Sequence, residues 1–130
     1  MRIVVDNKKC TGCRICEQTC SAFHNRAVNI YRSRIRVTSS ETLPNAAETC
    51  KHCRIPKCYE ACKVDAMAID EDKIVTVLED KCVQCYMCVD ACPFDMMFID
   101  AVTEYPIKCD LCGGDPRCVK QCPEGALSLK

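Results

Sequence analysis

Residues 82–93 read CVQCYMCVDACP: four cysteines separated by two, two and three residues, with a proline after the last. Three more stretches of the 130-residue chain follow nearly the same plan, so all sixteen cysteines fall into four quartets. The quartets are Cys10, Cys13, Cys16 and Cys20; Cys50, Cys53, Cys58 and Cys62; Cys82, Cys85, Cys88 and Cys92; and Cys109, Cys112, Cys118 and Cys122. This fourfold repeat organises the whole chain.

The spacing of the third quartet is the run C-x2-C-x2-C-x3-C-P, through which thiolates hold iron–sulfur clusters. The first quartet matches it except that Ser21 replaces the proline, and Pro123 follows the fourth quartet. The second and fourth quartets enlarge the middle gap to four and five residues, and no quartet lacks a cysteine. The pattern therefore predicts four 4Fe-4S clusters, with iron bound through the sixteen cysteines, and a chain that carries electrons.

Disulfides and zinc are the two other uses of clustered cysteines. A disulfide scaffold is typical of short secreted chains, but the first ten residues, MRIVVDNKKC, contain no signal-peptide core. A structural zinc site needs only two C-x2-C pairs separated by a spacer. Here four cysteines crowd into 11 to 14 residues, four times over. Iron–sulfur ligation accounts for this density best.

Charge and composition argue against two kinds of function, nucleic-acid binding and membrane insertion. Residues 1–65 carry a net charge of +6 and residues 66–130 a net charge of −6. Bound clusters add negative charge and aromatic residues are only 5%, so no nucleic-acid partner is expected. No apolar run approaches the roughly 20 residues of a membrane span, so we expect no direct membrane insertion and a cytoplasmic protein. The thin apolar core implies that metal binding supplies much of the folding free energy, and that the apoprotein is largely unfolded.

Short extended segments are expected between the quartets. Residues 66–69 and 73–78 flank the turn Asp70-Glu71-Asp72 and predict a hairpin. Strands at 2–5 and 126–129 are candidates to pair with each other. Further predictions are a strand region at 28–37, weaker strands at 97–99 and 104–107, and a polar connecting loop at 38–49.

The spacing of the quartets suggests how they pair. In two-cluster proteins the fourth cysteine of one motif ligates the cluster of the other. Nineteen residues separate Cys62 from Cys82, a spacing similar to that of small bacterial ferredoxins. We expect quartets two and three to form one unit, residues 50–108, inserted in another made by quartets one and four, residues 1–49 plus 109–130. The fold class is α+β, with two pseudo-symmetric ferredoxin-like units and a small core around the clusters. Pairing neighbouring quartets in chain order is the alternative.

Four motifs in this nested order resemble the iron–sulfur subunits of molybdenum and tungsten oxidoreductases, of the formate dehydrogenase and dimethyl-sulfoxide reductase type. They also resemble small relatives that accompany aldehyde oxidoreductases, carbon monoxide dehydrogenase and hydrogenases. The resemblance implies a non-catalytic subunit for electron transfer, which connects a catalytic oxidoreductase subunit, tungsten or molybdenum favoured, with a ferredoxin or flavoprotein. A free-standing polyferredoxin is the alternative, and no DNA-binding element supports a redox sensor. No Ser/His/Asp set, phosphate loop or paired-carboxylate site predicts catalysis by the chain itself.

The resemblance also implies which cysteines share a cluster. Each cluster takes three ligands from one quartet and the fourth from its partner quartet. The implied sets are Cys10, Cys13, Cys16 and Cys122; Cys109, Cys112, Cys118 and Cys20; Cys50, Cys53, Cys58 and Cys92; and Cys82, Cys85, Cys88 and Cys62.

Two other groups of residues have candidate roles. Arg32, Arg34 and Arg36 alternate along an expected strand and would share one face, either solvated or docking an acidic or cluster-bearing partner. His24 and His52 are not expected as ligands because thiolates complete every site, but His52 is a candidate hydrogen-bond donor to a sulfur.

Basic and apolar residues near the ligands complete the predictions. Positive charge beside quartets one and two would raise cluster potentials there relative to quartets three and four. The residues concerned are Arg14, Lys51, Arg54 and Lys57. Met96, Met97 and Phe98 are expected to pack against a cluster.

Overall fold

The computed structural model describes residues 2–38, 42 and 45–130 as a small mixed fold of short helices and strands. Its α-helices are α1 (Ile15–Asn25), α2 (Lys57–Ala61), α3 (Met87–Ala91) and α4 (Arg117–Gln121), with 3-10 turns η1 (Ile30–Arg32) and η2 (Leu111–Gly113). The strands are β1 (Ile3–Val5), β2 (Ile35–Thr38), β3 (Ala46–Thr49), β4 (Met67–Ile69), β5 (Val75–Val77), β6 (Phe98–Ile99), β7 (Pro106–Ile107) and β8 (Leu127–Leu129).

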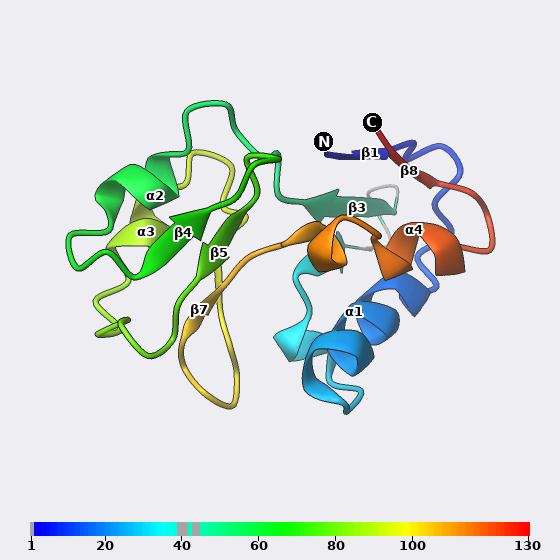
Figure 1. Ribbon diagram of the computed structural model, residues 1–130. Helices are drawn as coiled ribbons and strands as arrows, with labels where there is room; N and C mark the ends of the chain where they lie inside the picture. Colours follow the sequence, from blue (N-terminus) through cyan, green and yellow to red (C-terminus); the bar gives the residue numbers. More distant parts are fainter. Residues whose placement is uncertain (1, 39–41, 43–44) are drawn as a thin grey trace.

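Strand pairing confirms two of the sequence-based predictions. Strand β1 pairs antiparallel with β8, with Ile3 opposite Leu129, so the two ends of the chain lie side by side (Figure 1). Strands β4 and β5 form the expected hairpin. The Asp70 carboxylate accepts hydrogen bonds from the backbone N–H groups of Asp72 and Ile74 and so closes its turn. The weaker strands at 97–99 and 104–107 also form, as the pair β6 and β7.

The region between the first two quartets differs from prediction. Residues 30–32 of the expected strand at 28–37 form the 3-10 turn η1, and only residues 35–37 of it belong to a strand, β2. Residues 46–49 of the expected loop form strand β3, which pairs with β2. Residues 39–41, 43 and 44 of that loop lie outside the described part of the chain. The buried Glu17 carboxylate holds β2 in place because it accepts a hydrogen bond from the N–H of Val37.

The helices follow the cysteine spacing. Helices α2, α3 and α4 each span five residues, contain the third cysteine of a quartet, and end just before the fourth. Helix α2 packs against α3, and α1 packs against α4. Figure 1 shows the first pair beside β4 and β5, and the second pair beside β1 and β8. Quartets two and three are therefore neighbours, as are quartets one and four.

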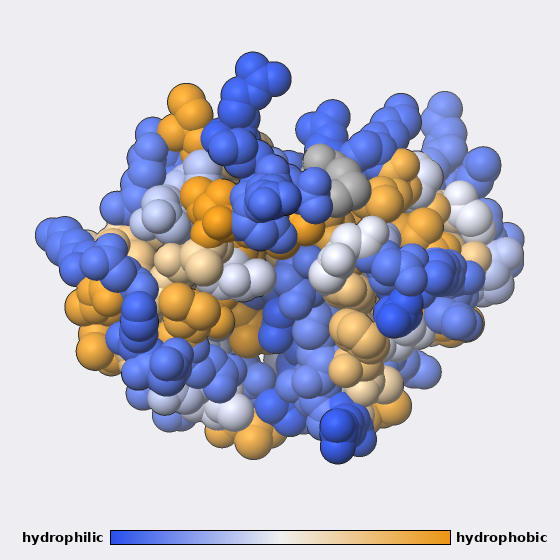
Figure 2. All heavy atoms as spheres, viewed as in Figure 1, coloured by the Kyte–Doolittle hydropathy of each residue, from blue (hydrophilic) through white to orange (hydrophobic). Residues whose placement is uncertain are grey.

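The core is thin, and cysteines are part of it. A larger buried group contains Ile3, Ile35 and Leu111, and a smaller one contains Met67, Val75 and Met97. The larger group also includes five buried cysteines: Cys16, Cys20, Cys50, Cys109 and Cys118. Met96 and Met97 are buried and Phe98 is half-buried, while their packing against a cluster stays a prediction. Figure 2 shows apolar and charged side chains interspersed over the surface. Within the described residues, no helix is long and apolar enough to cross a membrane.

Candidate metal centres

Four cavities in the described part of the chain are each lined by four cysteines, three from one quartet and one from another. We name each cavity after the first of the three. The sets are Cys10, Cys13, Cys16 and Cys122 (Cys10 cavity); Cys109, Cys112, Cys118 and Cys20 (Cys109 cavity); Cys50, Cys53, Cys58 and Cys92 (Cys50 cavity); and Cys82, Cys85, Cys88 and Cys62 (Cys82 cavity). These sets coincide with those that the family resemblance implies, while ligation of iron stays a prediction.

Left-handed backbone conformations shape each cysteine loop. The residue just before the second cysteine of every quartet has a positive φ: Gly12 (74°), His52 (48°), Gln84 (59°) and Leu111 (54°). Such a residue turns neighbouring N–H groups toward one point and forms a concave anion site, as in many iron–sulfur proteins. Three of these residues donate their N–H to the sulfur of the first cysteine: His52 to Cys50 at 3.3 Å, Gln84 to Cys82 at 3.4 Å and Leu111 to Cys109 at 3.5 Å.

The fourth cysteines receive hydrogen bonds through a second turn. Asp65 and Asp95, three residues after Cys62 and Cys92, have φ of 55° and 56°. The next residue then donates its N–H to the cysteine sulfur, Ala66 to Cys62 at 3.2 Å and Met96 to Cys92 at 3.3 Å. Hydrogen bonds to sulfur stabilise the charged thiolate, so the loops are built to hold anionic sulfur.

Several of the buried thiols are neutral at pH 7 without a metal. Burial raises the pKa of Cys16 to about 12 and those of Cys88 and Cys109 to about 11. All sixteen cysteines are free of disulfide bonds. Thiols that lose their protons only to a strong, soft Lewis acid fit the chemistry of an iron–sulfur cluster. The donor set of every cavity therefore fits the group that the spacing predicts.

His52 adds an independent sign of fit at the Cys50 cavity. Its ring lines the cavity, and both ring nitrogens are buried without a hydrogen-bond partner in the described part of the chain. Burial and the charge of Lys108 lower its pKa to about 4, so the ring is neutral at pH 7 and carries one N–H. A buried donor without an acceptor is costly, and cluster sulfur is an acceptor that this position fits.

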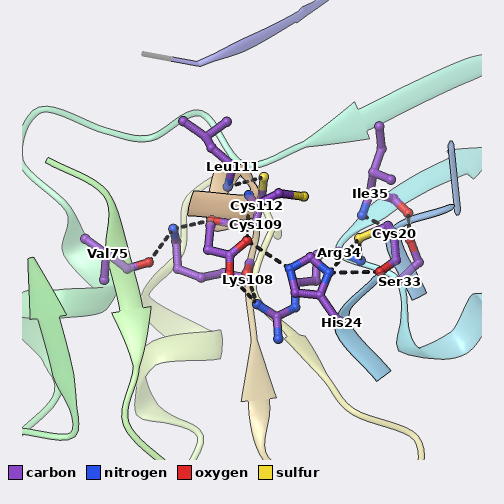
Figure 3. Close-up of polar contacts among 11 residues, drawn as sticks. Cys20, His24, Ser33, Arg34, Ile35, Val75, Lys108, Cys109, Leu111 and Cys112 are labelled. Atoms are coloured by element: carbon purple, nitrogen blue, oxygen red, sulfur yellow. Dashed lines mark hydrogen bonds and ion pairs between the residues drawn. The ribbon is translucent and has the colours of Figure 1, made fainter. Parts of the chain in front are cut away.

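A polar network borders the Cys109 cavity (Figure 3). His24 Nε2 pairs with Asp110 Oδ1 at 2.9 Å, and His24 Nδ1 lies 2.8 Å from the carbonyl oxygen of Cys20 and 3.6 Å from its sulfur. Although burial opposes protonation, the hydrogen bond to Asp110 raises the pKa of His24 to about 9. The charged ring donates through both nitrogens. His24, Asp110 and Cys112 also lie close together, a proximity that this ion pair and the cavity explain.

The three arginines do not share an exposed strand face. Arg32 lies in η1, where its Nε bonds the buried Asp100 at 2.9 Å. Arg34 bonds the carbonyl of Lys108 at 3.2 Å, and Arg36 stacks on the ring of Phe98. The predicted alternation is present, because buried Ser33, Ile35 and Val37 alternate with the half-buried arginines. The predicted strand is not, since only Arg36 lies in β2, and each guanidinium has a partner within the chain.

Charge is distributed unevenly among the four cavities. Three lysines near the surface, Lys51, Lys57 and Lys73, line the Cys50 cavity together with the buried Lys108. The Cys82 cavity is lined by no charged side chain of the described residues. Arg14 lines the Cys10 cavity, but its charge is paired with buried Glu17 at 3.2 Å.

Sequence reasoning missed two features of these centres. His24 pairs with Asp110, 86 positions along the chain. The ammonium of Lys108 donates to the carbonyl of Val75 in strand β5, 33 positions away. Only the position of Lys108 next to Cys109 was visible in the sequence. The accessibility of the ligands was not visible either: Cys13 and Cys85 are exposed, whereas the other cysteines are buried or half-buried.

The chain is similar to known iron–sulfur proteins. A family described as 4Fe-4S dicluster domain matches residues 42–130, and one described as 4Fe-4S binding domain matches residues 7–23. Over 84 residues the chain is 42% identical to the aliphatic sulfonate oxidoreductase, polyferredoxin-like subunit of Pyrococcus furiosus, a match that covers 64% of this chain and 49% of that protein. It is 31% identical to the thiosulfate reductase electron transfer subunit PhsB of Salmonella typhi, over 62% of this chain and 45% of that protein.

These curated relatives are about twice the length of the segments that match. A solved structure resembles nearly the whole chain. It is a chain of the active site complex BamBC of benzoyl coenzyme A reductase with benzoyl-CoA, 32% identical, with a TM-score of 0.56 over 98% of this chain and 76% of that one.

Proposed function

Because the chain belongs to the 4Fe-4S dicluster domain family, we propose that it is an electron-transfer subunit that holds four 4Fe-4S clusters. The observation that carries the proposal is the set of four cavities, each lined by four cysteines. Clusters bound there supply one-electron carriers. The protein binds them through thiolates, supplies N–H groups to the sulfurs and sets the local charge.

The chain acts as two ferredoxin-like units, one inserted in the other. Residues 50–108 form the inner unit, and residues 1–49 plus 109–130 form the outer unit. The packing of α2 on α3 and of α1 on α4, and the pairing of the two chain ends, support this division. The cross-quartet cysteine sets support it as well, since they argue against pairing of neighbouring quartets in chain order.

We assign the two ends of the electron path to the cavities with exposed ligands. Cys13 at the Cys10 cavity and Cys85 at the Cys82 cavity are exposed. Electron transfer requires close approach, so partners exchange electrons at these two cavities. The Cys50 and Cys109 cavities, whose cysteines are all buried or half-buried, lie between them in the path.

The distribution of charge sets the order in which the cavities accept electrons. A cluster gains negative charge on reduction, so nearby positive charge raises its potential. We assign the highest potential to the Cys50 cavity, where four lysines gather, and the lowest to the uncharged Cys82 cavity. Potentiometric EPR on the loaded protein checks this order, and four equal potentials contradict it.

The catalytic partner is a reductase subunit with tungsten or molybdenum, and the second partner is a ferredoxin or flavoprotein. The subunit names of the relatives from Pyrococcus furiosus and Salmonella typhi support a multi-subunit oxidoreductase. Anaerobic purification of the tagged protein from its own host tests the proposal. We expect a stable complex with a second subunit that contains tungsten or molybdenum. Elution of the chain alone, fully loaded with iron, would instead identify a diffusible polyferredoxin.

A further inference from the structure

Lys108 is a buried cation at the junction of the inner and outer units. It follows strand β7, precedes Cys109 and is 4% exposed. Its ammonium donates to the carbonyl oxygen of Cys109 at 2.8 Å and to that of Val75 at 3.1 Å. Figure 3 shows the side chain reaching from the start of the fourth quartet to strand β5. One side chain therefore contacts a proposed ligand residue of the outer unit and the hairpin of the inner unit.

This charge has no carboxylate partner among the described residues. Asp110, two positions along the chain, is already paired with His24 and Arg34. A lysine ammonium has three donors, and its two carbonyl acceptors carry no net charge. Because a buried charge is strongly disfavoured unless it is paired, the position of Lys108 calls for an anion that the side chains of the described residues do not supply.

The ammonium lies at one cysteine cavity and donates to the main chain of a residue that lines a second one. Lys108 lines the Cys50 cavity, and its main chain leads directly into Cys109, which lines the Cys109 cavity. Burial raises the pKa values of Cys53, Cys58 and Cys109, and the charge of Lys108 acts against that rise at all three thiols. Its field therefore reaches sulfur atoms in both cavities.

We propose that Lys108 is a charge-setting residue shared by the Cys50 and Cys109 cavities, whose buried ammonium stabilises the reduced form of a cluster in each. The proposal rests on the proposed function, because it requires clusters in both cavities. The stabilisation is mutual: the anionic clusters pair the buried ammonium, and the ammonium raises both potentials together. One charge therefore acts on the potentials of both cavities, on either side of the unit junction.

The test compares Lys108→Gln with Lys73→Gln on the fully loaded protein. Lys73 lines the same cavity but is exposed, so solvent screens its charge. Potentiometric EPR follows each cluster, and Cys13→Ser and Cys85→Ser variants identify the signals of the Cys10 and Cys82 cavities by the change that they cause. For Lys108→Gln we expect the reduced-to-oxidised ratio of the clusters in the Cys50 and Cys109 cavities to fall about tenfold at fixed potential. This change corresponds to about 59 mV for a one-electron couple. Lys73→Gln should change the ratio less than about twofold.

A merely structural role predicts a different outcome. If Lys108 only ties β5 to the fourth quartet, Lys108→Gln leaves all four ratios unchanged or shifts all four alike, and either result overturns the proposal. If the Gln variant fails to load its clusters, Lys108→Arg decides, because it keeps the charge: wild-type ratios are expected, and a tenfold fall overturns the proposal. Absence of iron–sulfur signals from the wild-type protein would instead count against the proposed function itself.

Discussion

The ion pair of His24 and Asp110 gives a stability prediction whose size follows from the structure. Burial opposes the charged form of both residues, but their mutual hydrogen bond outweighs it. The pKa of His24 therefore rises from 6.5 to about 9, and the pKa of Asp110 falls from 3.8 to about 2. At about 1.4 kcal/mol per pKa unit, the shift of Asp110 corresponds to about 2–3 kcal/mol and that of His24 to about 3–4 kcal/mol. The Asp110 side chain is 24% exposed, and solvent screening reduces the figure to about 2 kcal/mol.

The two shifts define the pH range of this stabilisation. The raised pKa of His24 gives stability that is complete below pH 6.5 and is lost as the pH rises through about 9. The lowered pKa of Asp110 gives stability that is present above pH 3.8 and is lost as the pH falls through about 2. The pair therefore contributes fully from about pH 4 to pH 6.5 and fades above that range.

The perturbation is Asp110→Asn, and the assay is the rate at which visible cluster absorbance disappears in denaturant under anaerobic conditions. If the pair breaks before the transition state, removing about 2 kcal/mol of stabilisation makes the cluster absorbance disappear about 30-fold faster at pH 6.5. The advantage of the wild type should shrink by about pH 10. Asp115→Asn is the matched control, because Asp115 pairs with Arg117 and Lys120 at an exposed site of the same loop. Equal rates for the two variants would refute the reasoning.

Three further predictions concern other parts of the fold. Gly12→Ala should weaken the Cys10 cavity by about 1–2 kcal/mol, because Gly12 has φ 74° and a Cβ there would lie 2.8 Å from Asn45; Gly125→Ala, also at positive φ but in open space, should cost less in the same absorbance assay. Asp100→Asn should cost about 1–3 kcal/mol by unpairing the buried contact with Arg32, and a thermal midpoint equal to wild type would contradict this. Removal of iron should abolish most far-UV circular dichroism, since near-native ellipticity would mean that the chain folds without its clusters.

The parts of the fold that the sequence predicted are those with local causes. The hairpin of β4 and β5 follows from alternating residues around Asp70-Glu71-Asp72, whose own carboxylate closes the turn. Helices α2, α3 and α4 contain the third cysteine of a quartet and end just before the fourth, whereas α1 continues past Cys20 to Asn25. Strand β3 was missed because its sequence, AAET, has no strand pattern, and its pairing depends on β2 across the polar segment that joins them.

The same distinction holds for the candidate centres. The family resemblance that the cysteine spacings carry implied the four sets of cysteines that line the cavities. Arg32, Arg34 and Arg36 each have a distant partner, respectively Asp100, the carbonyl of Lys108 and the ring of Phe98, and nothing near these arginines in the sequence indicates it. Lys108 gains its role only when folding brings the carbonyl of Val75 beside it.

The central claim is that all sixteen cysteines hold four clusters in one small chain. Its most direct test is iron and acid-labile sulfide analysis of the anaerobically purified protein, with Mössbauer spectroscopy to identify cluster type. We predict about sixteen iron and about sixteen sulfide per chain, all in 4Fe-4S clusters. About half that iron content in homogeneous, fully folded protein, or zinc in place of iron, would contradict the account.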